Sequence, residues 1–413
     1  MSPNMHQYYR RCLVGLFNQV QMLRVDPHAR IETCLTIQET LVEKITYVES
    51  RIRKRKSSRK SLLERLTVGQ PVRLDKAGAR AIKDQISASS GTVDEYHLLL
   101  DTLRQVGDSL AFMYLDKWDI KPLSFGQPPG FISHKKGLRQ ELRVLRGLFA
   151  SGQVAILNDI TNCLRYGDIT IPKYGRPFFV EVKSSNRIDS RARRQISKAQ
   201  RVREYLSKDK AEDLYGLKGE FRRFEVHAQE IHHRERLNSL IGAAVNNGVG
   251  YAEVEEGLHY LVSTGASPNP LDPIKDKCYG TGIVSLVNEL KHGNTGYYPF
   301  TLSFSDPEAL YDFYRGWLFI LILVDSGVIT RKLGSQGLEV ELLSDEDCAF
   351  EIRRREYSTG DRRPFRIGRH IFGRVFAEFV SLDWLLQEIV DNMQRLEAAL
   401  EVTEEEQSKW VVN

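Results

Sequence analysis

Two runs of alternating apolar residues constrain the fold more than any other feature of the sequence. The runs, residues 168–171 and 178–183, are separated by the segment PKYGRP, whose proline and glycine residues suit a chain reversal. This pattern predicts a β-hairpin. A turn centred in the middle of that segment would place Asp168 directly opposite Glu181, because both residues lie equally far from its centre.

Such a hairpin would bring two carboxylates face to face. Alternation along the strand adds Lys183 to the face of Glu181, and it sends Ile169, Ile171, Val180 and Val182 to the opposite face, which we expect to be buried. Facing carboxylates repel each other unless a cation lies between them. We therefore expect a divalent cation, Mg²⁺ or Mn²⁺, beside Asp168 and Glu181.

This combination of residues points to metal-assisted hydrolysis of phosphodiesters. Mg²⁺ binds one or two carboxylates together with substrate phosphate oxygens. Asp168 and Glu181 would bind the metal, and Lys183 would position the attacking water. The structural alternative is an exposed salt bridge between Lys183 and either acid, which would contribute little stability.

The segment resembles the PD-(D/E)XK nuclease superfamily, whose signature is an aspartate before a hairpin turn and an ExK triplet on the next strand. Asp168 matches the aspartate and Glu181-Val182-Lys183 matches the triplet, but Gly167 stands where the signature has proline. The resemblance covers residues 130–265, about a third of the chain. It implies a restriction-endonuclease-like α/β core, in which helices flank a mixed sheet, with Mg²⁺-dependent endonuclease activity and the Val182 carbonyl as a further metal ligand.

The same spacing occurs a second time, so spacing alone is weak evidence. Asp276 is followed thirteen residues later by Glu289-Leu290-Lys291. The apolar residues before this copy have helical spacing, and on a helix residues two apart point in different directions. Glu289 and Lys291 would not share a face, so we favour the copy at residues 168–183.

A helix predicted within residues 133–152 carries a fourth candidate. Its leucines and Phe149 form one apolar stripe, and Glu141 falls inside that stripe. A carboxylate on an apolar face needs a partner. The resemblance implies that a glutamate on the helix before the first strand reaches the metal, so Glu141 is included in the predicted site. Alternatively, Glu141 lies at the edge of the stripe and reaches solvent.

Positive charge gathers in two segments, although the net charge is only +5. Seven basic residues in seventeen follow the triplet on a predicted helix, where Arg191, Arg194, Gln195 and Lys198 are the expected nucleic-acid contacts. Residues 51–60 hold seven basic residues in ten. Phosphate contact and a solvated helix face or mobile connector both remain open for this second run.

The chain length of 413 residues predicts two or three domains. Proline and glycine clusters at residues 122–130 and 267–273 divide it into a helical N-terminal region (1–118), the nuclease core (119–265) and an α/β C-terminal region (266–413) that would bind substrate or drive oligomerisation. The apolar run 316–324 has about half the length of a membrane helix. It is predicted as a buried helix that begins behind Asp306-Pro307.

These features predict a cytoplasmic, metal-dependent nuclease. The five cysteines include no CxxC pair, and the N-terminus lacks the apolar segment of a signal peptide. We expect nucleic acid as the partner, DNA rather than RNA, no membrane association, and a homodimer or higher homo-oligomer, because a two-strand cut generally needs two sites. A role in bacterial antiviral defence against foreign DNA is a further hypothesis. The alternative is a non-cleaving nucleic-acid-binding or protein-interaction module on the same fold.

Overall fold

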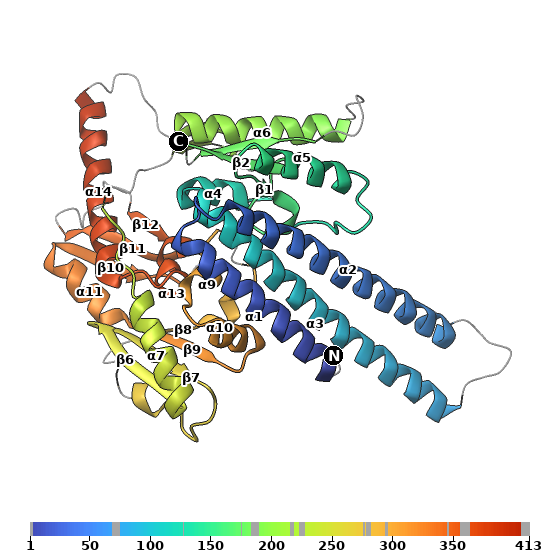
Figure 1. Ribbon diagram of the computed structural model, residues 1–413. Helices are drawn as coiled ribbons and strands as arrows, with labels where there is room; N and C mark the ends of the chain where they lie inside the picture. The colour runs from blue at the N-terminus through green and yellow to red at the C-terminus, as the bar shows by residue number, and fades with distance from the viewer. Residues whose placement is uncertain are drawn as a thin grey trace. The chain divides into compact units, whose positions relative to one another are not determined.

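The computed structural model shows a mixed α/β protein with helices and several antiparallel sheets (Figure 1). It describes residues 3–67, 75–126, 128–174, 176–182, 190–214, 219–222, 228–275, 277, 282–293, 296–344, 347–355 and 364–405. The chain forms two compact units. Unit 1 consists of Met1–Phe224 and His292–Tyr311, and unit 2 of Glu225–Lys291 and Asp312–Asn413. Residues 1–118 and 119–224 therefore belong to one unit, and residues 225–265 to the other.

Three long helices form the first part of unit 1, as the helical periodicity predicts (Figure 1). They are α1 (Pro3–Val25), α2 (Ile31–Thr67) and α3 (Lys76–Tyr114). Their buried residues recur at three- and four-residue spacing, which is the pattern of a helix that packs one face. In α3, Leu98 is 47% exposed, whereas Leu99 and Leu103 are buried. The packed face also includes Val93 and Tyr96 earlier in the helix, so Leu98 lies beside this face.

The second part of unit 1 combines short helices with two small sheets. Its first sheet has the order β1-β2-β3 and the second pairs β4 with β5. Every strand pair in the described part of the chain is antiparallel, so a mixed sheet is not seen there. The elements are α4 (Lys117–Ser124), α5 (Leu138–Ala150), β1 (Ile156–Leu157), the 3₁₀ turn η1 (Asn158–Ile160), β2 (Ile169–Lys173), β3 (Arg176–Val180), α6 (Ser190–Lys208), β4 (Lys210–Glu212), β5 (Glu220–Arg222) and α9 (Phe300–Ser303).

One hydrophobic cluster joins these elements. It includes Leu115 from the end of α3, Ile120 from α4, Ile156 from β1 and Tyr205 from α6. The 3₁₀ turn η1 packs so closely on α3 that a Cβ at Gly107 would lie 2.1 Å from the backbone oxygen of Ile160. Only glycine permits this approach, which holds the turn before β2 against the long helix.

Unit 2 contains a four-stranded antiparallel sheet of order β6-β7-β9-β8 and a three-stranded sheet of order β10-β11-β12. Its strands are β6 (Val249–Glu255), β7 (Leu258–Ser263), β8 (Gly282–Leu286), β9 (Phe319–Asp325), β10 (Leu338–Leu342), β11 (Cys348–Arg354) and β12 (Phe365–Gly368). Its helices are α7 (Arg234–Asn247), α8 (Val287–Leu290), α11 (Ser326–Ser335), α12 (Arg369–Phe372), α13 (Arg374–Ala377) and α14 (Leu382–Glu405), with the 3₁₀ turn η3 (Asp272–Ile274).

The prediction of a buried helix over the apolar run 316–324 is wrong. Helix α10 (Pro307–Arg315) does begin as predicted, with Asp306 accepting a hydrogen bond from the Glu308 N–H at 2.9 Å, but it ends before the run. Most of the run forms β9, which is flanked by β7 and β8. A short continuous apolar run has no periodicity that separates a buried strand from a buried helix. No helix in the described ranges is both long and apolar enough to cross a membrane.

The second copy of the Asp and ExK spacing does not form a hairpin. Residues 282–286, expected to be helical, form β8, and only Val287–Leu290 form a helical turn, α8. Glu289 lies in that turn and Asp276 lies outside the described residues. The helical prediction was therefore wrong for β8, whereas Glu289 lies on a helix as expected.

Candidate functional site

The hairpin at residues 169–180 has the register that the sequence predicts. Ile169 pairs with Val180 and Lys173 pairs with Arg176, and Asp168 and Glu181 lie directly before the first strand and directly after the second. The Asp168 N–H donates to the Val180 carbonyl oxygen at 3.0 Å. Both Asp168 and Ile169 thus lie beside Val180, and this bond fixes Asp168 at the open end of the hairpin.

Gly167 has a backbone conformation that proline cannot adopt. Its φ is +78°, in the left-handed region, whereas the proline ring fixes φ near −65°. A Cβ at this position would also lie 3.2 Å from the Cβ of Phe179. The departure from the family signature at this position therefore has a local steric cause.

Asn158 anchors the chain on both sides of Asp168. Its side-chain nitrogen donates to the carbonyl oxygens of Tyr166 and Gly167 at 2.7 and 3.1 Å. Its side-chain oxygen accepts from the Thr170 hydroxyl at 2.8 Å. Asn158 is 2% exposed, so these bonds are shielded from water and fix the entry into β2.

The two faces of the hairpin are less distinct than predicted. Ile169 is fully buried, as expected, but Thr170 on the face of Asp168 is also fully buried. Phe179, opposite Thr170, packs against the hydrophobic cluster of unit 1. The prediction of a buried face is wrong for most of its residues, because Ile171, Val180 and Val182 are only partly buried and Phe178 on the same face is 45% exposed. Glu181 is exposed at the open end of the hairpin.

The Asp168 carboxylate is bound on both oxygens. Oδ2 accepts a hydrogen bond from the Val182 N–H at 2.9 Å, which ties the carboxylate to the segment directly after β3. Oδ1 accepts from the Nζ of Lys135 at 3.0 Å. Lys135 precedes helix α5 and was not predicted as part of the site.

Lys135 gathers three carboxylates around one ammonium group. Its Nζ lies 2.7 Å from Asp159 Oδ2, 2.9 Å from Glu141 Oε1 and 3.0 Å from Asp168 Oδ1. Asp159 comes from the 3₁₀ turn η1, Glu141 from α5 and Asp168 from the start of the hairpin. We call these four residues the acidic centre.

The loop that carries Lys135 is fastened to α2. Glu49 of α2 is completely buried, and its carboxylate accepts from the N–H groups of Ile132 and Ser133 at 3.1 and 2.7 Å. Arg53, one turn further along α2, donates to the Ser133 carbonyl oxygen at 2.7 Å. His134 follows with a φ of +73°, a conformation that non-glycine residues adopt only at some cost. Several contacts thus determine the position of Lys135.

Glu141 is buried, so the alternative in which it reaches solvent is wrong. It is 1% exposed, so it does not reach solvent from the edge of the stripe. Burial raises the pKa of its carboxyl group, Lys135 opposes this effect, and the nearby Asp168 and Asp159 add to it. Its Oε1 contacts Lys135, but its buried Oε2 has no hydrogen-bond partner.

The charge of Lys135 is stabilised despite its partial burial. Burial works against the charged form, but the three carboxylates outweigh it and raise the pKa of the ammonium group. Lys135 is therefore charged at neutral pH. As the side chains stand, no three His, Cys, Asp or Glu residues in the described part of the chain are arranged to hold a metal ion.

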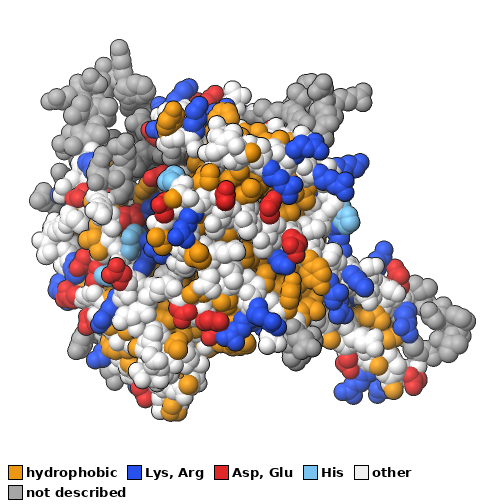
Figure 2. Space-filling model, in the orientation of Figure 1, with side chains coloured by type: hydrophobic (Ala, Val, Ile, Leu, Met, Phe, Trp, Pro, Cys, Tyr) orange, Lys and Arg blue, Asp and Glu red, His pale blue; other side chains and the backbone are white. Residues whose placement is uncertain are grey.

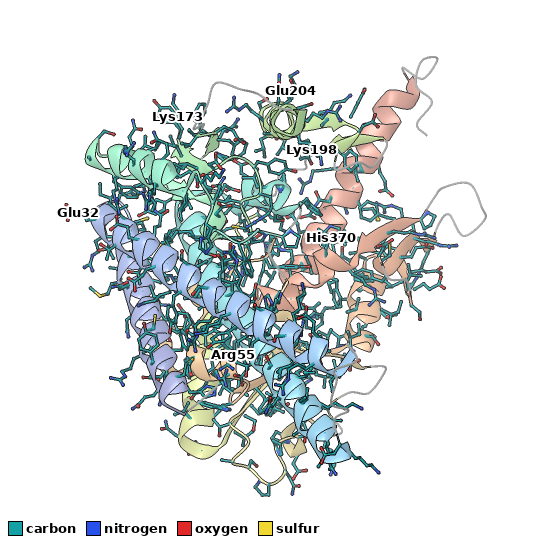
Figure 3. The ribbon with its side chains drawn as sticks, turned by 90° about the vertical axis from the view of Figure 1, so that its right-hand side faces the viewer. Glu32, Arg55, Lys173, Lys198, Glu204 and His370 are labelled. Carbon is teal, nitrogen blue, oxygen red and sulfur yellow. The ribbon has the colours of Figure 1, made fainter. Side chains whose placement is uncertain are left out.

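Several predicted site residues cannot be placed in this centre. Lys183 lies outside the described residues, and the side chains of Arg191, Arg194 and Gln195 are likewise not described, although these three residues belong to α6. Lys198 is exposed on α6 (Figure 3). The structure therefore brings Asp168 and Glu141 together and places Glu181 and Val182 at the adjacent strand end.

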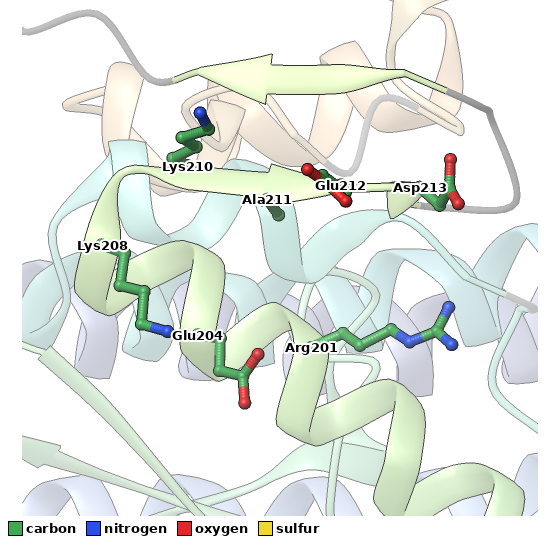
Figure 4. Close-up of a pocket in the computed structure, with 7 residues that line it drawn as sticks. All are labelled: Arg201, Glu204, Lys208, Lys210, Ala211, Glu212 and Asp213. Atoms are coloured by element: carbon green, nitrogen blue, oxygen red, sulfur yellow. The ribbon is translucent and has the colours of Figure 1, made fainter.

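An open pocket of about 570 Å³ lies elsewhere in unit 1, between α6 and β4 (Figure 4). Its lining mixes three basic with three acidic side chains and contains none of the residues of the acidic centre. The lining residues are Arg201, Glu204, Lys208, Lys210, Ala211, Glu212 and Asp213. We therefore base the candidate site on the acidic centre rather than on this pocket.

Sequence reasoning missed Lys135, Asp159 and Asn158. Lys135 stands in a loop and Asp159 in a three-residue turn, so neither falls into a period or a motif. The only available signal is that Asp159 and Asn158 come directly before the hairpin. Comparison with known proteins adds nothing here, since no protein-family model, curated protein or solved structure matches the chain.

Proposed function

We propose that the protein is a metal-dependent nuclease that hydrolyses phosphodiester bonds of nucleic acid, DNA in preference to RNA. The observation that carries this proposal is that Glu141, Asp159 and Asp168 lie around one partly buried position. Asp168 directly precedes β2, and Glu181 directly follows the paired strand β3. Carboxylates from three separate segments have been brought to a place where they repel one another unless a cation is present. The PD-(D/E)XK resemblance predicts a metal at the same aspartate.

The residues of this site fit Mg²⁺ or Mn²⁺. Both are bound through carboxylate oxygens, and Glu141 offers a buried oxygen with no hydrogen-bond partner. Asp168 and Glu181 would hold the cation, with the Val182 carbonyl as a further ligand and Glu141 assisting. A bound divalent cation would supply positive charge that offsets the charge developing at phosphorus.

The remaining roles belong to side chains of this chain. Lys183, two residues beyond Glu181, would orient the attacking water and neutralise charge on the phosphate. The hydrogen bond from the Val182 N–H holds Asp168 against the segment that directly precedes Lys183 in the chain. Positioning of this kind accounts for a large part of the catalysis of phosphoryl transfer.

Exposed basic residues of unit 1 support a nucleic-acid substrate. The basic run at residues 51–60 is helical and lies on α2, so it is no mobile connector, and Lys54, Arg55 and Lys56 are exposed (Figure 3). Arg53 within this run binds the loop that carries Lys135. Basic and acidic side chains are interspersed over the face shown in Figure 2. Phosphate binding would therefore be local, along α2 and, with Arg191, Arg194, Gln195 and Lys198, along α6.

We further propose a restriction-endonuclease-like core around the β1-β2-β3 sheet, a cytoplasmic location, assembly as a homodimer or higher homo-oligomer, and a role in bacterial defence against foreign DNA. The hairpin, with α5 before it and α6 after it, supports the first of these proposals. The others rest on the nuclease proposal and are tested after it.

The test is cleavage of linear DNA, circular DNA and single-stranded RNA by purified protein with Mg²⁺, Mn²⁺ or EDTA. We expect divalent-dependent cleavage that falls at least about 100-fold in Asp168→Asn and in Lys183→Ala. Lys173→Ala is the matched control, because Lys173 is an exposed lysine of the same hairpin, and it should keep wild-type activity. Cleavage that persists in both site variants would contradict the proposal.

A second candidate function is a nucleic-acid-binding module that does not cleave. The observation that favours it is Lys135, because an ammonium group already neutralises part of the acidic centre without any metal. Such a module would bind DNA equally well as wild type and as Asp168→Asn, and it would form no divalent-dependent product. Fluorescence anisotropy with labelled DNA in EDTA, together with the cleavage assay, separates the two functions.

A further inference from the structure

The acidic centre contains more negative groups than its single cation balances. Three carboxyl groups face the Nζ of Lys135, all at 3.0 Å or less. The side chain of Glu141 is only 2% exposed, whereas those of Asp159 and Asp168 are 28% and 18% exposed. The centre is thus closed on the side of Glu141 and open on the side of the two aspartates.

We infer that Lys135 is the resident counter-ion of the proposed divalent-cation site, that Asp159 joins Asp168, Glu181 and Glu141 there, and that the metal ion displaces the Lys135 ammonium when it binds. This inference rests on the proposed function for the identity of the cation, Mg²⁺ or Mn²⁺. It adds Asp159 as a ligand, and it makes Lys135 a positioning residue that keeps the carboxylates together before the metal arrives.

An unpartnered oxygen supports a metal ligand set rather than a complete ion-pair network. Glu141 is 1% exposed, and its Oε2 has no hydrogen-bond partner, although a buried carboxylate oxygen is normally satisfied. Lys135 can bind only Oε1 of this carboxylate while it also serves the two aspartates. A divalent ion carries a second positive charge and accepts more oxygen ligands, so it would balance the centre better.

A metal ion bound between the three carboxylates would take the position of the ammonium group and draw the carboxylate oxygens closer together. The three oxygens lie 2.7–3.0 Å from Nζ, whereas Mg²⁺ requires oxygens at about 2.0–2.1 Å. Each carboxylate oxygen would have to move inward by up to about 1 Å, which side-chain rotation allows. The Lys135 side chain is 31% exposed and has a flexible four-carbon stem, so its ammonium can swing into solvent.

Competition between lysine and metal makes a measurable prediction. The ammonium must leave before the metal binds. The apparent metal affinity of the wild-type protein is therefore the intrinsic affinity multiplied by the fraction of molecules from which the ammonium has left. Removal of the ammonium should then strengthen metal binding. Loss of a positive charge beside three carboxylates strengthens cation binding even without displacement, so displacement itself is shown by the release of Lys135 into solvent when the metal binds.

The experiment is calorimetric titration of Mn²⁺ into metal-free wild-type protein and variants. We expect Lys135→Met to bind Mn²⁺ at least about tenfold more tightly than wild type, and Asp159→Asn and Asp168→Asn to bind it more weakly. Lys136→Met is the matched control, because Lys136 is the exposed neighbour in the same loop, and it should leave the affinity unchanged.

A second measurement uses the wild-type protein alone and so does not depend on the folding of variants. Acylation of lysines by an amine-reactive ester is followed by mass spectrometry with and without Mn²⁺. Release of Lys135 into solvent should raise its labelling several-fold on addition of Mn²⁺, whereas labelling of Lys136 should stay constant. Constant labelling of Lys135 in a protein that binds Mn²⁺ would overturn the inference.

The outcomes separate this inference from the proposed function. Mn²⁺ binding that requires Asp168, but that is equal in wild type, Lys135→Met and Asp159→Asn, would leave the nuclease proposal standing and would overturn the role of Lys135 and Asp159. Failure of wild type and Lys135→Met alike to bind Mn²⁺ would overturn both. Tighter binding in Lys135→Met with weaker binding in Asp159→Asn would support both.

Discussion

At the scale of single residues, the acidic centre depends on groups that are held by buried hydrogen bonds. Asn158 fixes the backbone on either side of Asp168, and Glu49 fixes the loop that leads to Lys135. Gly167 provides the left-handed turn directly before Asp168. A substitution at any of these positions should displace a carboxylate or the lysine without removing it.

Gly167→Ala should destabilise unit 1 more than Gly152→Ala does. Both glycines have φ near +77°, where a side chain costs about 1 kcal/mol or more. A Cβ at Gly167 would also press on Phe179 and on the Val180 carbonyl oxygen at 3.2 Å, whereas nothing lies within 4 Å of a Cβ at Gly152. We expect the urea midpoint to fall further for Gly167→Ala by an amount that corresponds to about 1 kcal/mol. Equal midpoints would contradict the steric argument.

Asp108 should make unit 1 less stable as the pH rises from about 4 to about 6. Burial raises the pKa of Asp108 to about 6, although hydrogen bonds from the N–H groups of Asn162 and Cys163 oppose the shift. In that pH range the folded protein keeps a proton that the unfolded chain, with a pKa of about 3.9, has lost. Stability therefore decreases with pH there, by at most about 3 kcal/mol, and the decrease is complete above the folded pKa.

Asp108→Asn provides the control for this pH effect. The variant lacks the titrating group. The urea midpoint of the wild type should therefore fall relative to that of the variant as the pH rises from 4 to 6. All other carboxyl groups are common to both proteins and cancel in the comparison. A difference that is independent of pH would show that Asp108 does not titrate in this range.

At the scale of elements, the hairpin determines where the chemistry lies. Its two-residue loop begins at Tyr174, which has a φ of +54° and is 96% exposed. Such loops favour residues that tolerate the left-handed region, as in Asn-Gly. Tyrosine is therefore strained here without any packing that offsets the strain.

Tyr174→Asn should stabilise the hairpin by about 0.5–1 kcal/mol, because asparagine adopts the left-handed conformation at lower cost. Tyr174→Ala is the control, since it also removes the exposed ring but keeps the backbone strain. Amide hydrogen exchange of the 169–180 peptide reports the result. Slower exchange in Tyr174→Asn than in Tyr174→Ala is expected, and the reverse order would contradict the assignment of strain to this residue.

At the scale of the whole molecule, unit 1 is completed by a segment that is remote in sequence. Residues 292–311 belong to unit 1, although residues 225–291, which come directly before them, belong to unit 2. The contacts of this segment with the long helices are polar as well as apolar: His292 bonds Asp101, and Gln21 donates to the carbonyl oxygens of Thr301 and Phe304 at 3.1 and 2.7 Å. The fold of unit 1 therefore depends on both passes of the chain.

Gln21→Ala should loosen α9 specifically, because it removes two hydrogen bonds to backbone oxygens of that short helix. The loss is about 1–2 kcal/mol, so hydrogen exchange of residues 300–304 should accelerate roughly 5- to 30-fold. Asn18→Ala is the matched control on the same helix, since Asn18 binds only Val14 within α1. Equal acceleration in both variants would contradict the role of Gln21 in docking α9.

The sequence by itself determined the local features of this protein. Turn residues and period-two alternation specify the hairpin and its register, and three- and four-residue spacing specifies the long helices, because these patterns depend on neighbours within a few residues. The apolar run at 316–324 was predicted wrongly as a helix, since only its position between β7 and β8 makes it a strand.

Only the tertiary structure decided the composition of the acidic centre. Asp168 and Glu141 were predicted, but Lys135 and Asp159 join them because buried Glu49 fastens the Lys135 loop to α2 and because Gly107 lets the turn that carries Asp159 approach α3. These contacts link residues that are 50 to 84 positions apart in the chain. No local pattern records such pairings, since they arise from packing between elements and not from the conformational preferences of either segment.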